Sequence, residues 1–263
     1  MTAEGPRPTA GSVTVVIPVK DDAAGLRRCL RALALQTEPA DEIIVVDNGS
    51  QDDSARVARE GGATVLACER PGIPAAAAVG YDAAAGELIL RLDADCLPAA
   101  TWVETMRTFA GRRPDVDVFA GGARFIDGPR TLRSTLAAAY LGVYALVLTP
   151  TLGHLPLFGS NLGMRRDAWQ RVSATVHRDD PEIHDDLDLS FHLGERHRIR
   201  FVPAAAMGIS MRPFSSASAF LQRVDRGRRT VVRHWPADFP PLRWARLTRR
   251  RTARRITPSE PTG

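Results

Sequence analysis

The chain has 263 residues, of which 44% are hydrophobic and 25% charged, enough for a sizeable core in one large domain or two small ones. No run of about 18 uncharged apolar residues occurs, so a membrane-spanning helix is not expected, and the longest apolar stretch, 136–148, is too short to cross a bilayer. The net charge of +5 is unevenly distributed, because residues from Arg212 to the end include 13 arginines and three acids, which suits an anionic partner.

Predicted strands and helices alternate over the N-terminal part of the chain. Apolar and β-branched runs predict strands at 12–19, 41–50, 63–69 and 87–92. Amphipathic patterns and capping residues predict helices at 23–36, from 54 onward, and at 74–86. This order predicts parallel β-α-β units in a doubly wound α/β sheet, in which ligands bind beyond the carboxyl ends of the strands.

Acidic residues follow three of these predicted strands, at Asp21 and Asp22, at Asp47, and at Asp93 and Asp95. Charged acids are costly to bury without a cationic partner. They therefore either mark solvated strand ends or hold a cation or a polar ligand. Two common nucleotide-binding motifs are missing, because Lys20, the only lysine, precedes an acid and forms no Walker A loop, and no GxGxxG occurs.

Five segments, in this order, resemble the family 2 glycosyltransferases of the GT-A fold. They are VVIPVKDDAAGLRRCLRAL, IIVVDNGSQDDS, GYDAAAGELILRLDADC, FGSNLGMRRDAW and HDDLDLSFHL, within residues 13–195. The resemblance implies a Rossmann-like GT-A domain at 13–210 with a doubly wound, mainly parallel sheet. It also implies transfer of a sugar from a nucleotide-diphosphate sugar to a hydroxyl acceptor on a lipid, a glycan or a small molecule, with inversion at the anomeric carbon.

The resemblance assigns the nucleotide to the ends of the first two strands, at Pro18, Lys20, Asp22 and Asp47. The competing structural roles are a simple turn at Asp47 and helix capping at Asp22. The sequence DAD matches the family's DxD motif, in which Asp95 would bind Mg²⁺ or Mn²⁺ and Asp93 would share the ion or touch the ribose. Such an ion offsets charge on a departing diphosphate.

The segment HDDLDL matches the acceptor side of the family's site. Asp186 would deprotonate the acceptor hydroxyl, as inverting transfer requires, and Asp185 would contact the acceptor. The competing role of both acids is stabilising a helix N-terminus. Gly159 and Asn161 are implied to contact the acceptor or the donor sugar, with a strand and tight turn as the alternative. Arg212 would bind the diphosphate bidentately.

Three departures from the family pattern weaken parts of this assignment. Ala77 and Ala78 stand where many members have Arg and Asn, a contact that Arg70 or Arg91 could replace. The metal-binding His of many members is missing near Arg212. The QxxRW motif of processive members is also missing, which disfavours synthesis of long polymers. The alternatives are a pseudoenzyme, a retaining or nucleotidyl transferase of the same fold, and a nucleic-acid-binding module that uses the arginine-rich end.

The two ends of the chain carry separate expectations. Residues 1–12 lack a basic and apolar leader, so we expect a disordered tail and no secretory signal. Residues 211–263 predict a basic amphipathic extension, with a helix at 216–235, that either rests on anionic lipid or stays solvated; no nucleic-acid partner is expected. Three cysteines without a CxxC favour a reducing, cytoplasmic location. The basic extension would place the protein at the inner membrane face. The six histidines show no zinc-binding spacing.

Overall fold

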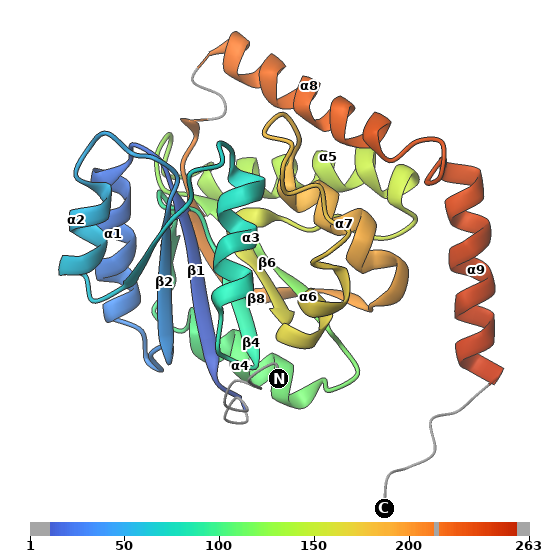
Figure 1. Cartoon of the computed structure of the whole chain (residues 1–263), viewed down its shortest axis with the longest axis horizontal. Helices are drawn as coiled ribbons and strands as arrows, with labels where there is room; N and C mark the ends of the chain where they lie inside the picture. Colours follow the sequence, from blue (N-terminus) through green and yellow to red (C-terminus); the bar gives the residue numbers. More distant parts are fainter. Residues whose placement is uncertain (1–10, 213–215, 257–263) are drawn as a thin grey trace, which may run out of the picture.

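The computed structural model describes residues 11–212 and 216–256, which form an eight-stranded sheet covered by helices (Figure 1). The strands are β1 (Val13–Val19), β2 (Glu42–Asp47), β3 (Thr64–Ala67), β4 (Leu88–Arg91), β5 (Leu97–Pro98), β6 (Val118–Phe125), β7 (Leu162–Arg165) and β8 (Ile199–Ile209). The helices are α1 (Ala23–Ala34), α2 (Ser54–Glu60), α3 (Ile73–Ala83), α4 (Trp102–Arg112), α5 (Arg133–Leu152), the short 3₁₀ turn η1 (Gly159–Asn161), α6 (Arg166–Val172), α7 (Asp185–Arg196), α8 (Ala217–Arg233) and α9 (Pro240–Ile256).

The sheet order, β3-β2-β1-β4-β7-β6-β8-β5, contains a topological switch point between β1 and β4. β1 pairs in parallel with both β2 and β4, and β2 pairs in parallel with β3. β7 runs antiparallel between β4 and β6, and β6 pairs in parallel with β8. The predicted doubly wound, mainly parallel α/β sheet is confirmed. In such sheets the crevice beyond the switch point is the usual ligand site.

The side chains of β1 explain why this strand is a continuous apolar run. Val13, Val15 and Ile17 join the core that α1, α2 and α4 cover, whereas Val16 joins the core under α3, α6 and α7. Successive side chains of a strand point to opposite faces, so a strand covered on both faces is apolar at most positions. The exception in β1 is the buried Thr14, whose hydroxyl donates to Glu42. The carboxyl end of β1 is therefore fixed from two sides.

The C-terminal extension is helical and contacts the rest of the molecule through a few buried side chains. In Figure 1, α8 crosses the top of the molecule and α9 descends along its right side. The Arg243 side chain on α9 is fully buried and donates hydrogen bonds to the backbone oxygens of Leu152 (2.8 Å) and Phe191 (2.9 Å). The predicted amphipathic helix is confirmed as α8, but the α9 arginines are not all solvated, since Arg243 ties α9 to α5 and α7.

Helix α5 is longer than the apolar stretch seen in the sequence. Its 20 residues, Arg133–Leu152, are long and apolar enough to cross a membrane, and it is the one such helix within 11–212 and 216–256. The inference that this segment is too short was therefore wrong. Only 11% of its apolar window is buried, and Val143, Leu146 and Val147 are exposed.

The N-terminal tail predicted at 1–12 lies mostly outside the described residues, but its last two residues are held in place. The Gly11 N–H donates to Glu87, and the Ser12 hydroxyl accepts from the Glu87 N–H. Elsewhere, the three cysteines, Cys29, Cys68 and Cys96, are buried free thiols.

Candidate active site

The strand ends gather the predicted nucleotide residues at one rim of the sheet. Val19 of β1 lies in register with Asp47 of β2. Pro18 is buried within β1, whereas Lys20 is exposed just beyond it. The Pro18 ring is thus part of the core, and its contribution to the site is to position the residues that follow.

Asp22 and Asp47 also have the structural roles considered as alternatives to nucleotide binding, which are helix capping for Asp22 and a turn for Asp47. The Asp22 carboxylate caps α1 by accepting the Gly25 N–H at 3.0 Å. The Asp47 carboxylate accepts the Ser50 N–H at 3.1 Å in the turn after β2. One oxygen of each carboxylate makes these bonds, and a carboxylate has about four acceptor positions, so both side chains can still accept hydrogen bonds from a ligand.

Asp93 and Asp95 lie in the loop after β4, at the switch point. Asp93 accepts hydrogen bonds from Arg91 Nη2 (2.9 Å) and Ser160 Oγ (2.5 Å). Asp95 pairs with Arg212 at 3.1 Å, and the same guanidinium also pairs with Asp22. Arg212 therefore bridges the end of β1 to the DxD segment, in the position where a metal-binding histidine was missing from the sequence.

The donor set of this loop fits a hard divalent cation. Ligand atoms of Asp93, Asp95 and Cys96 lie within 4.8 Å of one another. Burial and the charge of Asp93 raise the pKa of Asp95, while Arg212 opposes this rise. Burial raises the pKa of the Cys96 thiol well above its usual value, so the thiol stays protonated. The two carboxylates are thus the candidate ligands, and oxygen donors of this kind suit Mg²⁺ or Mn²⁺.

Arg91, the last residue of β4, connects the two acidic centres. Its side chain is 3% exposed, and it pairs with Asp93 at 2.9 Å and with Asp185 at 3.3 Å. Gly159 makes room for it, because a Cβ at this position would collide with the guanidinium. The Arg91 side chain therefore requires a glycine at position 159. This is a structural reason for Gly159, which was predicted to contact the acceptor or the donor sugar.

The N-terminus of α7 holds the second acidic centre. Asp186 accepts the Gly159 N–H at 3.0 Å and the Leu187 N–H at 2.8 Å. Burial raises the pKa of Asp185 to about 7; Arg91 opposes this, and the charges of Asp186 and Asp93 add to it. Neither acid is the N-cap of α7, which is His184. Two carboxylates in the first turn thus exceed what helix capping needs.

Asn161 does not have the predicted contact with a sugar. It is fully buried, accepts from Trp102 Nε1 at 2.8 Å, and donates to the backbone oxygens of Gly122 (2.8 Å) and Ala205 (2.7 Å). Its oxygen and both its N–H groups are engaged by the protein. The expectation that it contacts the acceptor or donor sugar is therefore wrong, because the side chain instead joins α4, β6 and β8.

The two arginines predicted to replace the contact missing at Ala77 and Ala78 have different environments. Arg70 is exposed and pairs with Asp179, whereas Arg91 is central to the site. Ala77 and Ala78 are buried in α3. The hydrogen bond from Ser160 to Asp93 was not predicted. Its only signal in the sequence is the polar pair Ser160–Asn161 directly after Gly159. Three histidines also converge on Asp188, two residues after Asp186.

Comparisons with known proteins show the family of the chain. The model of a family described as Glycosyl transferase family 2 matches residues 14–172. Glycosyltransferase AglE of Haloferax volcanii is 34% identical over 122 residues, covering 43% of this chain and 40% of the relative. An undecaprenyl-phosphate 4-deoxy-4-formamido-L-arabinose transferase of Pseudomonas aeruginosa is 39% identical over 93 residues, covering 32% of this chain and 27% of the relative. The chain thus spans well under half the length of these two curated relatives.

Solved structures share the fold. Mannosyltransferase PcManGT from Pyrobaculum calidifontis, in complex with GDP-Man and Mn²⁺, matches with a TM-score of 0.60 and 19% identity. The match covers 98% of this chain and 78% of that chain. It therefore includes the part of this chain that forms α8 and α9.

Proposed function

The chain belongs to glycosyl transferase family 2, and from that premise we propose that it transfers a sugar from a nucleotide-diphosphate sugar to a hydroxyl acceptor by metal-assisted, inverting displacement. The observation that carries the proposal is the pairing of two acidic centres through Arg91. Asp93 and Asp95 form one centre, and Asp185 and Asp186 form the other. A donor bound at the first centre would present its anomeric carbon to an acceptor held at the second.

The donor side would use the residues gathered at the sheet rim. Lys20, Asp22 and Asp47 would bind the base and ribose beyond β1 and β2. Asp95, with Asp93, would hold Mg²⁺ or Mn²⁺, which supplies positive charge opposite the departing diphosphate. Arg212 would turn from Asp22 and Asp95 toward the diphosphate oxygens, a rotation that its exposed side chain permits.

The acceptor side would use the first turn of α7. The Gly159 and Leu187 N–H groups fix the Asp186 carboxylate, one at each oxygen. Asp186 would take the proton of the attacking hydroxyl while the bond to the diphosphate breaks. Asp185, held by Arg91, would orient the acceptor by hydrogen bonding. A positioned base of this kind contributes about 10²–10⁴-fold to a rate.

Two matched variants test whether donor binding and proton transfer depend on different acids. Asp186→Asn should retain donor binding and lose transfer, whereas Asp95→Asn should lose Mn²⁺-dependent donor binding. Calorimetric titration with UDP-, GDP- and dTDP-sugars measures binding, and product analysis measures transfer. Equal loss of donor binding in both variants would show that Asp186 is not the base. Retention of anomeric configuration, or release of a nucleoside monophosphate adduct, would favour the retaining or nucleotidyl alternatives.

We also propose that the enzyme works on the cytoplasmic face of a membrane. Exposed apolar residues lie on α5 (Val143, Leu146, Val147). Phe220 on α8, Trp244 on α9 and Trp235 between these two helices are also exposed, beside many arginines. Basic residues near an anionic surface contribute about 1 kcal/mol each. An apolar pocket is lined by Tyr144, Leu155, Phe158 and Phe201. Phe158 immediately precedes Gly159 in the chain, so this pocket suits the apolar part of an acceptor.

Vesicle sedimentation tests the membrane proposal. The protein should bind vesicles that contain anionic lipid more than neutral vesicles, and Leu146→Asp should weaken binding without changing the unfolding temperature. Arg56→Ala, on the exposed surface of α2, is the matched control and should bind normally. Equal binding of wild type and Leu146→Asp would exclude α5 from the contact surface.

A further inference from the structure

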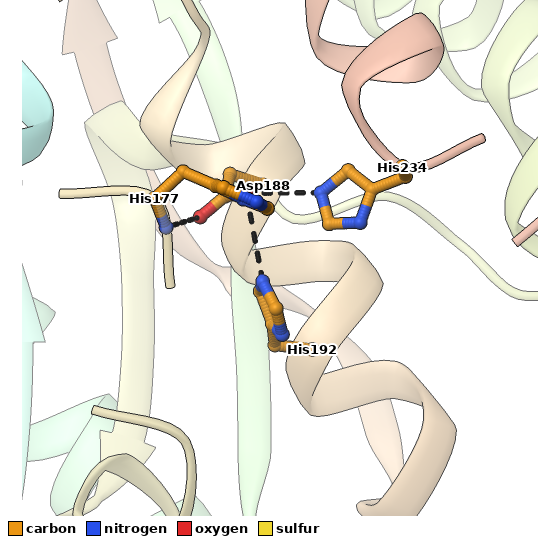
Figure 2. A group of neighbouring side chains, drawn as sticks. All are labelled: His177, Asp188, His192 and His234. Atoms are coloured by element: carbon orange, nitrogen blue, oxygen red, sulfur yellow. Dashed lines mark hydrogen bonds and ion pairs between the residues drawn. The ribbon is translucent and has the colours of Figure 1, made fainter. Parts of the chain in front are cut away.

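A second cluster of metal-ligating side chains lies outside the rim of the sheet. It consists of His177, Asp188, His192 and His234, which we call the histidine cluster. His177 follows α6, Asp188 and His192 lie one turn apart on α7, and His234 caps the C-terminus of α8. Figure 2 shows the three rings converging on the Asp188 carboxylate. No residue of this cluster has a role in the proposed transfer.

The four ligand atoms of the cluster lie close enough together to surround one ion. Asp188 Oδ1 lies 2.7 Å from His177 Nδ1, 2.9 Å from His234 Nε2 and 3.6 Å from His192 Nε2. All four ligand atoms lie within 4.8 Å of one another. Tetrahedral zinc bound at about 2.0–2.2 Å requires ligand atoms about 3.3–3.5 Å apart, and the three observed separations bracket that value.

The hydrogen bonds around His192 leave one nitrogen without an explanation. The Thr175 hydroxyl donates to the Val172 backbone oxygen at 2.8 Å. Its oxygen therefore accepts from His192 Nδ1, 3.3 Å away. In a neutral ring this bond leaves a lone pair on Nε2. That lone pair is buried without a hydrogen-bond partner and faces the Asp188 carboxylate. Two acceptors that face each other require a proton or a metal ion between them.

The outer contacts of the cluster resemble those of a metal site. Metal-bound histidines usually donate their second ring nitrogen to a neighbouring acceptor. His192 has Thr175 in this place, and His234 Nδ1 lies 3.5 Å from Asp238. The second oxygen of Asp188 accepts the His177 backbone N–H at 3.0 Å. These contacts orient the ligand atoms inward.

A proton is the competing occupant. Burial lowers the pKa of His234, but hydrogen bonds to Asp188 and Asp238 outweigh this effect and raise it. One charged ring could therefore hold Asp188 without a metal. Charging further rings would be unfavourable, because the three ring centroids lie only 5.1–5.6 Å apart. A single divalent ion satisfies all three rings and the carboxylate together.

We propose that the histidine cluster binds one Zn²⁺ through three imidazoles and one carboxylate, and that the ion fastens α8 to α7. Nitrogen-rich tetrahedral sites favour zinc, whereas Mg²⁺ and Mn²⁺ favour oxygen ligands. The side chains of Asp188 and His234 are 5% and 4% exposed, and four protein ligands leave no open position. The ion is thus structural. It would also steady the first turn of α7, where Asp186 lies two residues from Asp188.

The test uses the full chain, purified without a histidine tag and stripped with a chelator. Elemental analysis after re-addition of ZnCl₂ and dialysis should find one zinc per chain, and the unfolding temperature should rise. CoCl₂ in place of zinc should give the intense visible absorption of tetrahedral Co²⁺. An octahedral oxygen site gives only a weak spectrum.

Variants then locate the ion. His192→Ala should lose the tetrahedral cobalt spectrum, whereas Asp95→Asn, which removes a carboxylate at the sheet rim, should keep it. His197→Gln is the matched control, because His197 is another buried histidine, paired with Asp117 outside the cluster. No tetrahedral spectrum in the wild type, or a spectrum retained in His192→Ala, would overturn the proposal. The wild-type measurement holds even if a variant fails to fold.

Discussion

Replacing Arg91 by Met should destabilise the protein in a pH-dependent way. Arg91 is 3% exposed and is the cation that pairs with both Asp93 and Asp185. Methionine fills similar space but leaves the carboxylates uncompensated. Removing one partner of a buried ion pair costs about 3–5 kcal/mol. The lower end applies here, because the Asp93 side chain is 35% exposed and solvent screens part of its charge.

The sign of the pH dependence follows from Asp185. Its pKa in the folded protein is raised from 3.8 to about 7, so between these values the folded chain binds a proton that the unfolded chain lacks. Stability therefore falls as the pH rises through this window. Without Arg91 the pKa of Asp185 rises further. We expect the variant to be less stable than wild type by about 3 kcal/mol at pH 8.5 but only by about 1 kcal/mol at pH 5.5.

Urea titrations at both pH values measure this gap, and urea is preferred because it adds no ions. Arg165→Met is the control: Arg165 pairs with Glu87 at 2.9 Å at the other end of the β4–β7 pair and does not contact Asp185. Its cost should be similar at both pH values. An Arg91→Met gap that is equal at pH 5.5 and pH 8.5 would refute the idea that Arg91 keeps Asp185 ionised.

Three further predictions concern single residues. Asn161→Ala should cost roughly 3 kcal/mol in urea unfolding, since it removes the hydrogen-bond partner of Trp102 Nε1 and of two backbone oxygens, and should leave the donor KM of the remaining folded enzyme unchanged. Arg212→Gln should bind Mn²⁺ alone more tightly, because the substitution removes the guanidinium that pairs with Asp95. The same variant should bind a nucleoside diphosphate about tenfold more weakly by calorimetry. Arg243→Ala should lose about 3 kcal/mol or more, whereas exposed Arg249→Ala should change stability by less than about 0.5 kcal/mol.

The parts of the fold that the sequence predicted are those that depend on local pattern. The apolar run of β1 and the acids that follow β1, β2 and β4 are local signals, and parallel strands bring their carboxyl ends to one rim. The parallel register of β1 and β2 then places Asp47 beside Val19, at the end of β1. The switch point between β1 and β4 explains why the DxD segment lies beside Asp22.

The parts that the sequence did not predict depend on distant partners. Asn161 is a core residue only because Trp102, Gly122 and Ala205 surround it. The role of Arg91 follows from Asp185, which is far along the chain. The histidine cluster combines three elements, and its only local signal is the four-residue spacing of Asp188 and His192. Such sets have no short motif, so only tertiary structure reveals them.

The burial of all three cysteines has a practical consequence for testing whether α8 moves. Burial raises the pKa of the Cys29 and Cys96 thiols, and Cys68 is buried as well, so a maleimide reagent should find little to react with in the native protein. A single new thiol introduced by Leu221→Cys, at a site 63% exposed on α8, would then carry a fluorescent label. Its signal would report directly whether α8 lifts from α7 when donor or acceptor arrives.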